Sequence, residues 1–188
     1  DARLRQKAAA VERHEIDDAL RALADDMAET MYDEPGIGLA ATQVGVAKRL
    51  IVMDLDWSED GERNPRILLN PEIRVAEGKA VSEQEGCLSV PDFKSDVERH
   101  ARVVVRARTL DWEEVEFEAT ELESFCFQHE IDHLDGKLFV DAIAHAAIAA
   151  GYVTRLYDVA DAPLGNAAEA IRDIVAKGVA LGKVTADD

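Results

Sequence analysis

The chain is poor in cysteine, in positive charge and in long apolar stretches. Its two cysteines, Cys87 and Cys126, are too few for a disulfide framework, so a reducing compartment such as the cytoplasm is expected. No apolar run approaches the roughly 20 residues of a membrane span, and residues 1–10 lack the apolar core of a signal peptide. Lysine and arginine number 21 against 39 acidic residues, and the net charge of -18 argues against direct nucleic-acid binding, since phosphates would be repelled.

Apolar residues are present at a level that supports one core. They make up 47% of the 188 positions, and this length fits one domain better than two. Between Glu15 and Tyr32 they recur at gaps of three and four, which predicts a helix that stops before Pro35. A second helix is predicted from Thr120 to Gly136, with a capping box between Thr120 and Glu123.

The segments between these helices read as strands. They are Leu50–Leu55, Ile67–Leu69, Ile73–Val75, Arg102–Arg108 and Val115–Ala119. A helix followed by several strands and a second helix indicates an α+β fold with a mostly antiparallel sheet.

The second predicted helix contains the segment Gln128–His133, with the sequence QHEIDH. Side chains four residues apart share a helix face, so His129 and His133 can bind one metal ion, and Glu130 lies beside that face. The alternative is a helix that happens to carry two histidines, and the motif alone leaves the two interpretations about evenly matched. The helix's apolar stripe favours the metal, because buried imidazoles need a polar partner.

A third candidate ligand is Cys87 in the segment Glu85–Ser89 (EGCLS). Its thiolate is a good ligand for a divalent transition metal, although most free cysteines are small buried side chains, which is how we interpret Cys126. Two histidines and one thiolate leave a fourth position open for water, the arrangement of a catalytic zinc-type site.

The glycine-rich segment Gly36–Gln43 (GIGLAATQ) superficially matches a dinucleotide-binding fingerprint. That fingerprint requires a preceding strand and a following helix, whereas here the predicted helix comes first, so we reject it. The small residues instead indicate close backbone packing, for example against an extended substrate. Gln43 could donate to a developing oxyanion, but its spacing alone favours an ordinary loop glutamine.

Together, GIGLAATQ, EGCLS and QHEIDH resemble the three signature motifs of the peptide deformylases, in the same order. The similarity spans residues 1–141, which we take as the catalytic domain, with residues 142–188 as a helical C-terminal extension. It implies mostly antiparallel sheets packed around a central metal-binding helix. It also implies a metal-dependent hydrolase that removes the N-formyl group from the N-terminal formyl-methionine of nascent polypeptides and releases formate.

The resemblance also assigns roles to individual residues. The implied metal ligands are Cys87, His129 and His133. The metal would be ferrous iron (Fe²⁺), with Zn²⁺, Ni²⁺ or Co²⁺ able to substitute. Glu130 would be the general base and acid, and Gln43 with the backbone N–H of Leu88 would hold the formyl oxygen. The peptide would lie extended beside Gly38, in a methionine pocket lined by Ile37, Leu122, Phe125 and Cys126.

Two features depart from the family pattern. The short strand and proline that usually precede the segment at the start of this chain are absent from the sequence, which either leaves a sheet edge unpaired or reflects a trimmed chain. Residues 142–188 match no family motif, and their alanine-rich and apolar patterns predict two helices. Some deformylases dock on the ribosome through a basic C-terminal helix. Here acidic residues outnumber basic ones, which leaves ribosome association unsupported and leaves packing on the catalytic domain or self-association as alternatives.

Two other functions compete with this interpretation. A zinc endopeptidase also uses His-Glu-x-x-His, but usually takes its third ligand downstream, where His145 is the only histidine. A non-catalytic binding protein on the same scaffold would be expected to lose Glu130, which is present, although the absent first strand keeps this alternative open.

Overall fold

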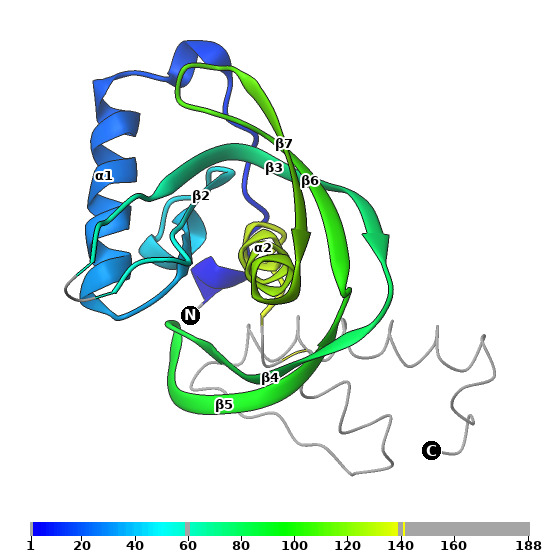
Figure 1. Ribbon diagram of the computed structural model, residues 1–188. Helices are drawn as coiled ribbons and strands as arrows, with labels where there is room; N and C mark the ends of the chain where they lie inside the picture. The colour runs from blue at the N-terminus through cyan, green and yellow to red at the C-terminus, as the bar shows by residue number, and fades with distance from the viewer. Residues whose placement is uncertain (1, 59–60, 139–140, 142–188) are drawn as a thin grey trace.

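The computed structural model describes residues 2–58, 61–138 and 141 (Figure 1). The two helices predicted within residues 142–188 lie outside the described residues, as does His145. The elements in chain order are η1 (Ala2–Arg5), η2 (Arg13–Glu15), α1 (Asp18–Asp33), β1 (Gly38–Ala40), η3 (Ala41–Val44), β2 (Leu50–Met53), β3 (Arg66–Glu77), β4 (Ala80–Cys87), β5 (Val90–Arg99), β6 (Arg102–Arg108), β7 (Glu114–Thr120) and α2 (Glu121–Leu134).

The strands form two antiparallel sheets around α2. Five strands pair in the order β1-β2-β3-β6-β7, and β4 pairs with β5 in a separate hairpin. In Figure 1 the long strands curve around α2, the hairpin lies below it and α1 lies to one side. The predicted α+β class with mostly antiparallel sheets around a central helix is confirmed. Among the described residues, no helix has the length and apolar character needed to cross a membrane.

Helix α1 follows its predicted apolar pattern. The side chain of Asp17 accepts a hydrogen bond from the backbone N–H of Leu20 at 2.9 Å and so caps the helix. The face that carries Leu20, Met27 and Met31 is buried. The helix ends at Asp33, just before Pro35, which cannot continue it.

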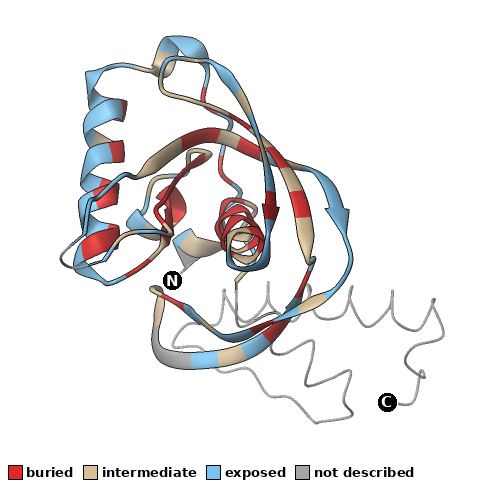
Figure 2. Ribbon diagram, viewed as in Figure 1, coloured by how far each residue is buried: buried red, intermediate tan, exposed pale blue. Residues whose placement is uncertain are grey.

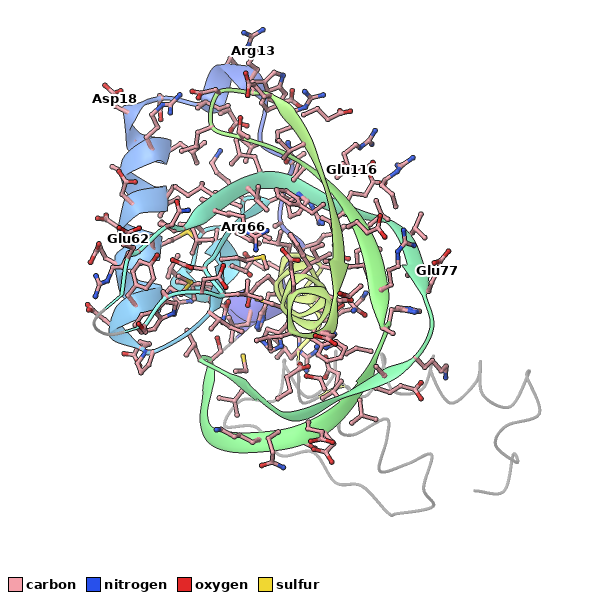
Figure 3. The ribbon with its side chains drawn as sticks, in the orientation of Figure 1. Arg13, Asp18, Glu62, Arg66, Glu77 and Glu116 are labelled. Carbon is pink, nitrogen blue, oxygen red and sulfur yellow. The ribbon has the colours of Figure 1, made fainter. Side chains whose placement is uncertain are left out.

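The predicted capping box of α2 is wrong. Thr120 occupies the N-cap position but its side chain makes no capping hydrogen bond. Glu123 instead accepts a hydrogen bond from Arg66 on β3 at 2.6 Å, and Figure 3 shows Arg66 in the interior of the view beside α2, whereas Glu77 and Glu116 point outward. The carboxylate of Glu123 therefore forms an ion pair with a residue distant in sequence and does not cap its own helix.

Strands β2 and β3 join two hydrophobic cores (Figure 2). On one side Ile51 and Met53 pack with Phe127 of α2, and on the other Leu50 and Val52 pack with α1. Burial on both faces explains why β2 reads as a continuous apolar run. The two strands predicted at 67–69 and 73–75 are one strand, β3, whose pairing with β6 is irregular near Asn70, a residue with a positive φ of 52°.

Candidate active site

Three potential metal ligands meet between β4 and α2. Cys87 is the last residue of β4, and His129 and His133 lie one turn apart on α2. The Sγ of Cys87 is 3.3 Å from Nε2 of His133, which is 3.1 Å from Nε2 of His129. All three side chains are buried, and their ligand atoms lie within 4.8 Å of one another. The structure thus brings together the three residues that the sequence predicted as ligands.

This cluster fits a divalent cation. The two Nε2 atoms lie 3.1 Å apart and the sulfur lies 3.3 Å from one of them, so a single cation could reach all three ligand atoms. Such a cation would satisfy all three, and a mixed nitrogen and thiolate set suits iron, cobalt, nickel or zinc. With three protein ligands one position stays open, as in catalytic sites.

A buried carboxylate outside the predicted set of site residues orients one of these potential ligands. Oε1 of Glu85 lies 2.8 Å from Nδ1 of His129. This contact leaves Nε2 of the same ring to face a metal. Arg99 on β5 holds Glu85 with two hydrogen bonds of 2.8 and 2.6 Å, and also binds Asp132 at 2.9 Å. Glu85 stands two residues before Cys87 on one strand, a same-face spacing that could have revealed it. Arg99 carried no such signal.

The charges of the cluster are strongly coupled. Burial alone lowers the pKa of His129, but hydrogen bonds that its ring donates to Cys87 and Glu85 outweigh it and raise this pKa to about 10. Burial and repulsion from His129 lower the pKa of His133 to about 3. Two imidazoles this close are not both in the cationic form, so at least one ring is neutral and can offer a nitrogen lone pair to a cation.

Glu130 lies beside the cluster without a fixed partner. Its side chain is 4% exposed, and its Oε2 atom makes no hydrogen bond within the described part of the chain. Burial raises the pKa of Glu130 to about 7, which suits a group that must both accept and return a proton near neutral pH. Gly38 packs so closely here that a Cβ atom would lie 2.7 Å from Oε1 of Glu130.

Gln43 is fixed near the cysteine ligand. Its Oε1 accepts from the backbone N–H of Ala40 at 2.8 Å, while its Nε2 donates to Ser89 at 3.1 Å and lies 4.0 Å from the Sγ of Cys87. The side chain is therefore held in the site, and is not the solvated loop glutamine that its spacing favoured. The backbone N–H of Leu88 has no hydrogen-bond partner in the ranges that the structure describes.

A cavity of about 680 Å³ opens over these groups. One wall comes from the segment between α1 and β1, one from the β4–β5 hairpin and one from α2. It is lined by Cys87, His129 and Glu130, by Gln43 and Leu88, and by the five predicted substrate residues Ile37, Gly38, Leu122, Phe125 and Cys126. His133 is buried and is not part of the lining.

Comparison with known proteins agrees with this arrangement. A family model described as polypeptide deformylase matches residues 1–148. The chain belongs to the polypeptide deformylase family. A peptide deformylase of Alkalilimnicola ehrlichii is 57% identical over 144 residues, which cover 77% of this chain and 78% of that protein.

Solved deformylase structures share the fold. The enzyme of Synechococcus elongatus, in complex with actinonin, has a TM-score of 0.71 and 42% identity, covering 82% of this chain and 85% of the other. A deformylase of Acinetobacter baumannii with Met-Ala-Ser bound has a TM-score of 0.68 and 38% identity, covering 76% and 92%. As a member of this family, the chain is a metal-dependent hydrolase that removes the N-formyl group from nascent polypeptides.

Proposed function

We propose that Cys87, His129 and His133 hold one divalent cation, and that it is ferrous iron in the cell, with Zn²⁺, Ni²⁺ or Co²⁺ able to replace it. The convergence of the three ligand atoms, beside a cavity that Cys87 and His129 line, is the observation that carries this proposal. When bound, the cation supplies Lewis acidity toward the formyl carbonyl and lowers the pKa of a water molecule. The thiolate ligand makes an iron site prone to oxidation.

Glu130 moves the proton. Its buried carboxylate lies beside the ligand cluster and faces the cavity, where an attacking water and the formyl carbon would meet. In its ionised form it accepts a proton from that water, and it then donates this proton to the departing amine, so formate and a free N-terminus result.

Gln43 and Leu88 stabilise the developing negative charge. The amide nitrogen of Gln43 and the backbone N–H of Leu88 are hydrogen-bond donors that border the cavity next to Cys87. Donors set in place before reaction need no reorganisation when the formyl oxygen gains charge, and losing one such donor typically costs about 3–4 kcal/mol of barrier.

The substrate peptide pairs with β1 as an added strand. β1 is an edge strand of the five-stranded sheet, and in the described part of the chain no strand pairs with the side of β1 away from β2, where an extended peptide could add. Ile37, Leu122, Phe125 and Cys126 line the cavity beside it and would receive the methionine side chain. A related deformylase binds Met-Ala-Ser, which supports recognition of residues beyond the methionine.

The division of the chain into a catalytic domain of residues 1–141 and a helical extension of residues 142–188 stays a prediction. The acidic charge of residues 142–188 gives no support for ribosome docking. The endopeptidase alternative loses its basis, because the family is that of deformylases and the third ligand next to the histidines is Cys87.

Replacing Glu130 by glutamine tests the catalytic assignment. We expect Glu130→Gln to reduce formate release from formyl-Met-Ala-Ser by about 10²- to 10⁴-fold, the typical contribution of general acid–base catalysis, with unchanged metal content. The matched control is Glu116→Gln, the same chemical change at an exposed position of β7 (Figure 3). If Glu130→Gln released formate within about threefold of the parent rate, as the Glu116→Gln control should, the assigned role of Glu130 would be refuted.

A further inference from the structure

Trp57 contacts the wall of the cavity from behind. Its indole N–H donates a hydrogen bond of 2.7 Å to the backbone carbonyl of Gly36, and Gly36 lines the cavity while Trp57 does not. Trp57 lies in the segment that follows β2, and its side chain is half-buried. It belongs to none of the three motifs that identify the family.

The indole is itself held in one orientation. The ring of Tyr32 on α1 packs against it edge to face, with centroids 5.1 Å apart and an interplanar angle of 73°. The hydroxyl of Tyr32 donates to the buried carboxylate of Asp54 at 2.7 Å, and the backbone N–H of Asn64 donates to the same carboxylate at 2.8 Å. Trp57 thus packs against Tyr32 of α1, whose hydroxyl is tied through Asp54 to both ends of the segment between β2 and β3.

The bond to Gly36 sets the orientation of the next backbone donor. In a trans peptide the C=O and the following N–H point in opposite directions, so the N–H of Ile37 points away from Trp57. That N–H has no hydrogen-bond partner in the part of the chain that the structure describes, and Ile37 lines the cavity. On its other side Gly36 touches Leu88, since a Cβ at Gly36 would lie 2.8 Å from Cδ1 of Leu88.

We infer that Trp57 is a positioning residue, which holds the Gly36–Ile37 peptide plane so that the cavity wall can pair with the part of the substrate beyond its methionine. This inference rests on the proposed pairing of substrate with β1. Gly38 adjoins Glu130, where the formyl group reacts. Gly36 lies two residues before Gly38, which is roughly 7 Å in an extended chain. The cavity extends along residues 34–36 and not along Leu39 or Ala40, so residues after the methionine would lie next to Gly36 and the formyl-methionine next to Gly38.

Trp57→Phe tests the inference, because it keeps an aromatic ring against Tyr32 and removes the N–H. Trp112→Phe is the matched control: Trp112 is the other tryptophan, it lies between β6 and β7, and it does not line the cavity. For each protein, kcat and KM are measured with formyl-Met-Ala-Ser and with formylmethioninamide, which has no residue after the methionine. The dissociation constant of the product Met-Ala-Ser is measured by calorimetry on the same samples.

We expect Trp57→Phe to raise KM for formyl-Met-Ala-Ser, and the dissociation constant of Met-Ala-Ser, by about fivefold, the equivalent of about one hydrogen bond. The kcat stays within about twofold, and KM for formylmethioninamide is unchanged, because uniform binding is lost and no transition-state contact is removed. Trp112→Phe behaves as the parent in every measurement.

Equal losses on both substrates, a fall in kcat alone, or no change in either binding constant would overturn the inference. A parent protein that binds Met-Ala-Ser but releases no formate would refute the proposed catalytic roles. The inference would still be supported in that case if Trp57→Phe weakened Met-Ala-Ser binding about fivefold. A parent that does not bind the peptide would overturn both.

Discussion

Asp54 shows how a single buried charge organises the segment behind the cavity. The spacing of Asp54 and Asp56 superficially suggests a calcium loop, yet the carboxylate of Asp54 accepts hydrogen bonds from Tyr32, Asn64 and the backbone N–H of Asp56. Burial by itself would raise the pKa of Asp54, but these hydrogen bonds outweigh it and hold the pKa below its ordinary value of 3.8. Hydrogen-bond donors of the protein thus satisfy the carboxylate of Asp54 in place of a cation.

The lowered pKa of Asp54 makes part of the stability depend on pH. A carboxyl whose folded pKa is depressed stabilises the protein above its unfolded pKa, and this contribution is lost as the pH falls below about 4. We expect Asp54→Asn to reduce the free energy of unfolding by about 2 kcal/mol at pH 7, and expect the difference from the parent to shrink between about pH 5 and pH 3. Urea denaturation of the parent and of Asp54→Asn, with a chelator present, measures the difference in their free energies of unfolding. Asp56→Asn is the control. A difference that is constant across this range would contradict the assignment.

Residue identities in the site were largely predictable, and their connections were not. Helical spacing predicted the pair His129 and His133, and the thiolate chemistry of Cys87 completed the predicted ligand set that the structure brings together. Arg99 was not predicted as a site residue because its position depends on the pairing of β4 with β5, in a hairpin whose sequence is mostly polar. A buried ion pair formed through tertiary pairing leaves no local sequence pattern.

At the scale of elements, apolar periodicity located the parts that face a core. Periodicity predicted α1, β6 and β7, whose buried residues recur or alternate in the sequence, and β2 was predicted from its continuous apolar run. Periodicity missed β4 and β5, because a hairpin that lies over the cavity has few apolar side chains to alternate. It also divided β3 in two at Asn70 and Pro71, residues typical of turns, although the strand continues through them.

The close packing of β1 on α2 makes Gly38 a sensitive position. A Cβ at this site would lie 2.7 Å from Oε1 of Glu130 and 2.8 Å from Sγ of Cys126, so Gly38→Ala must displace one of these side chains. We expect kcat for formyl-Met-Ala-Ser to fall by about 10²-fold, since a displacement of about 1 Å in a catalytic group has effects of that order. Formate release and thermal unfolding are measured together.

Gly61→Ala provides the comparison, because its Cβ would meet chiefly the hydroxyl of Ser58, which can rotate away. We expect its kcat to match that of the parent. A Gly38→Ala enzyme with full kcat would show that β1 does not constrain Glu130.

At the scale of the whole molecule, the active site exists only when the chain is folded. Cys87 arrives on the β4–β5 hairpin, His129 and His133 arrive on α2, and β1 closes the third side. A cation that binds all three ligands binds the folded state preferentially and stabilises it. Two cores on opposite sides of β2 and β3 hold these elements in place, which explains why a few motifs spread along the sequence can specify one site.

The most direct test is the metal content per chain and the rate of formate release, both determined on the same anaerobically purified sample of the parent, of Cys87→Ala and of Cys126→Ala. Both cysteines are buried, but only Cys87 belongs to the ligand cluster. The parent and Cys126→Ala should each carry about one iron per chain, and Cys87→Ala should lose both the metal and the release of formate. A Cys87→Ala protein that keeps its metal and its turnover would contradict the account.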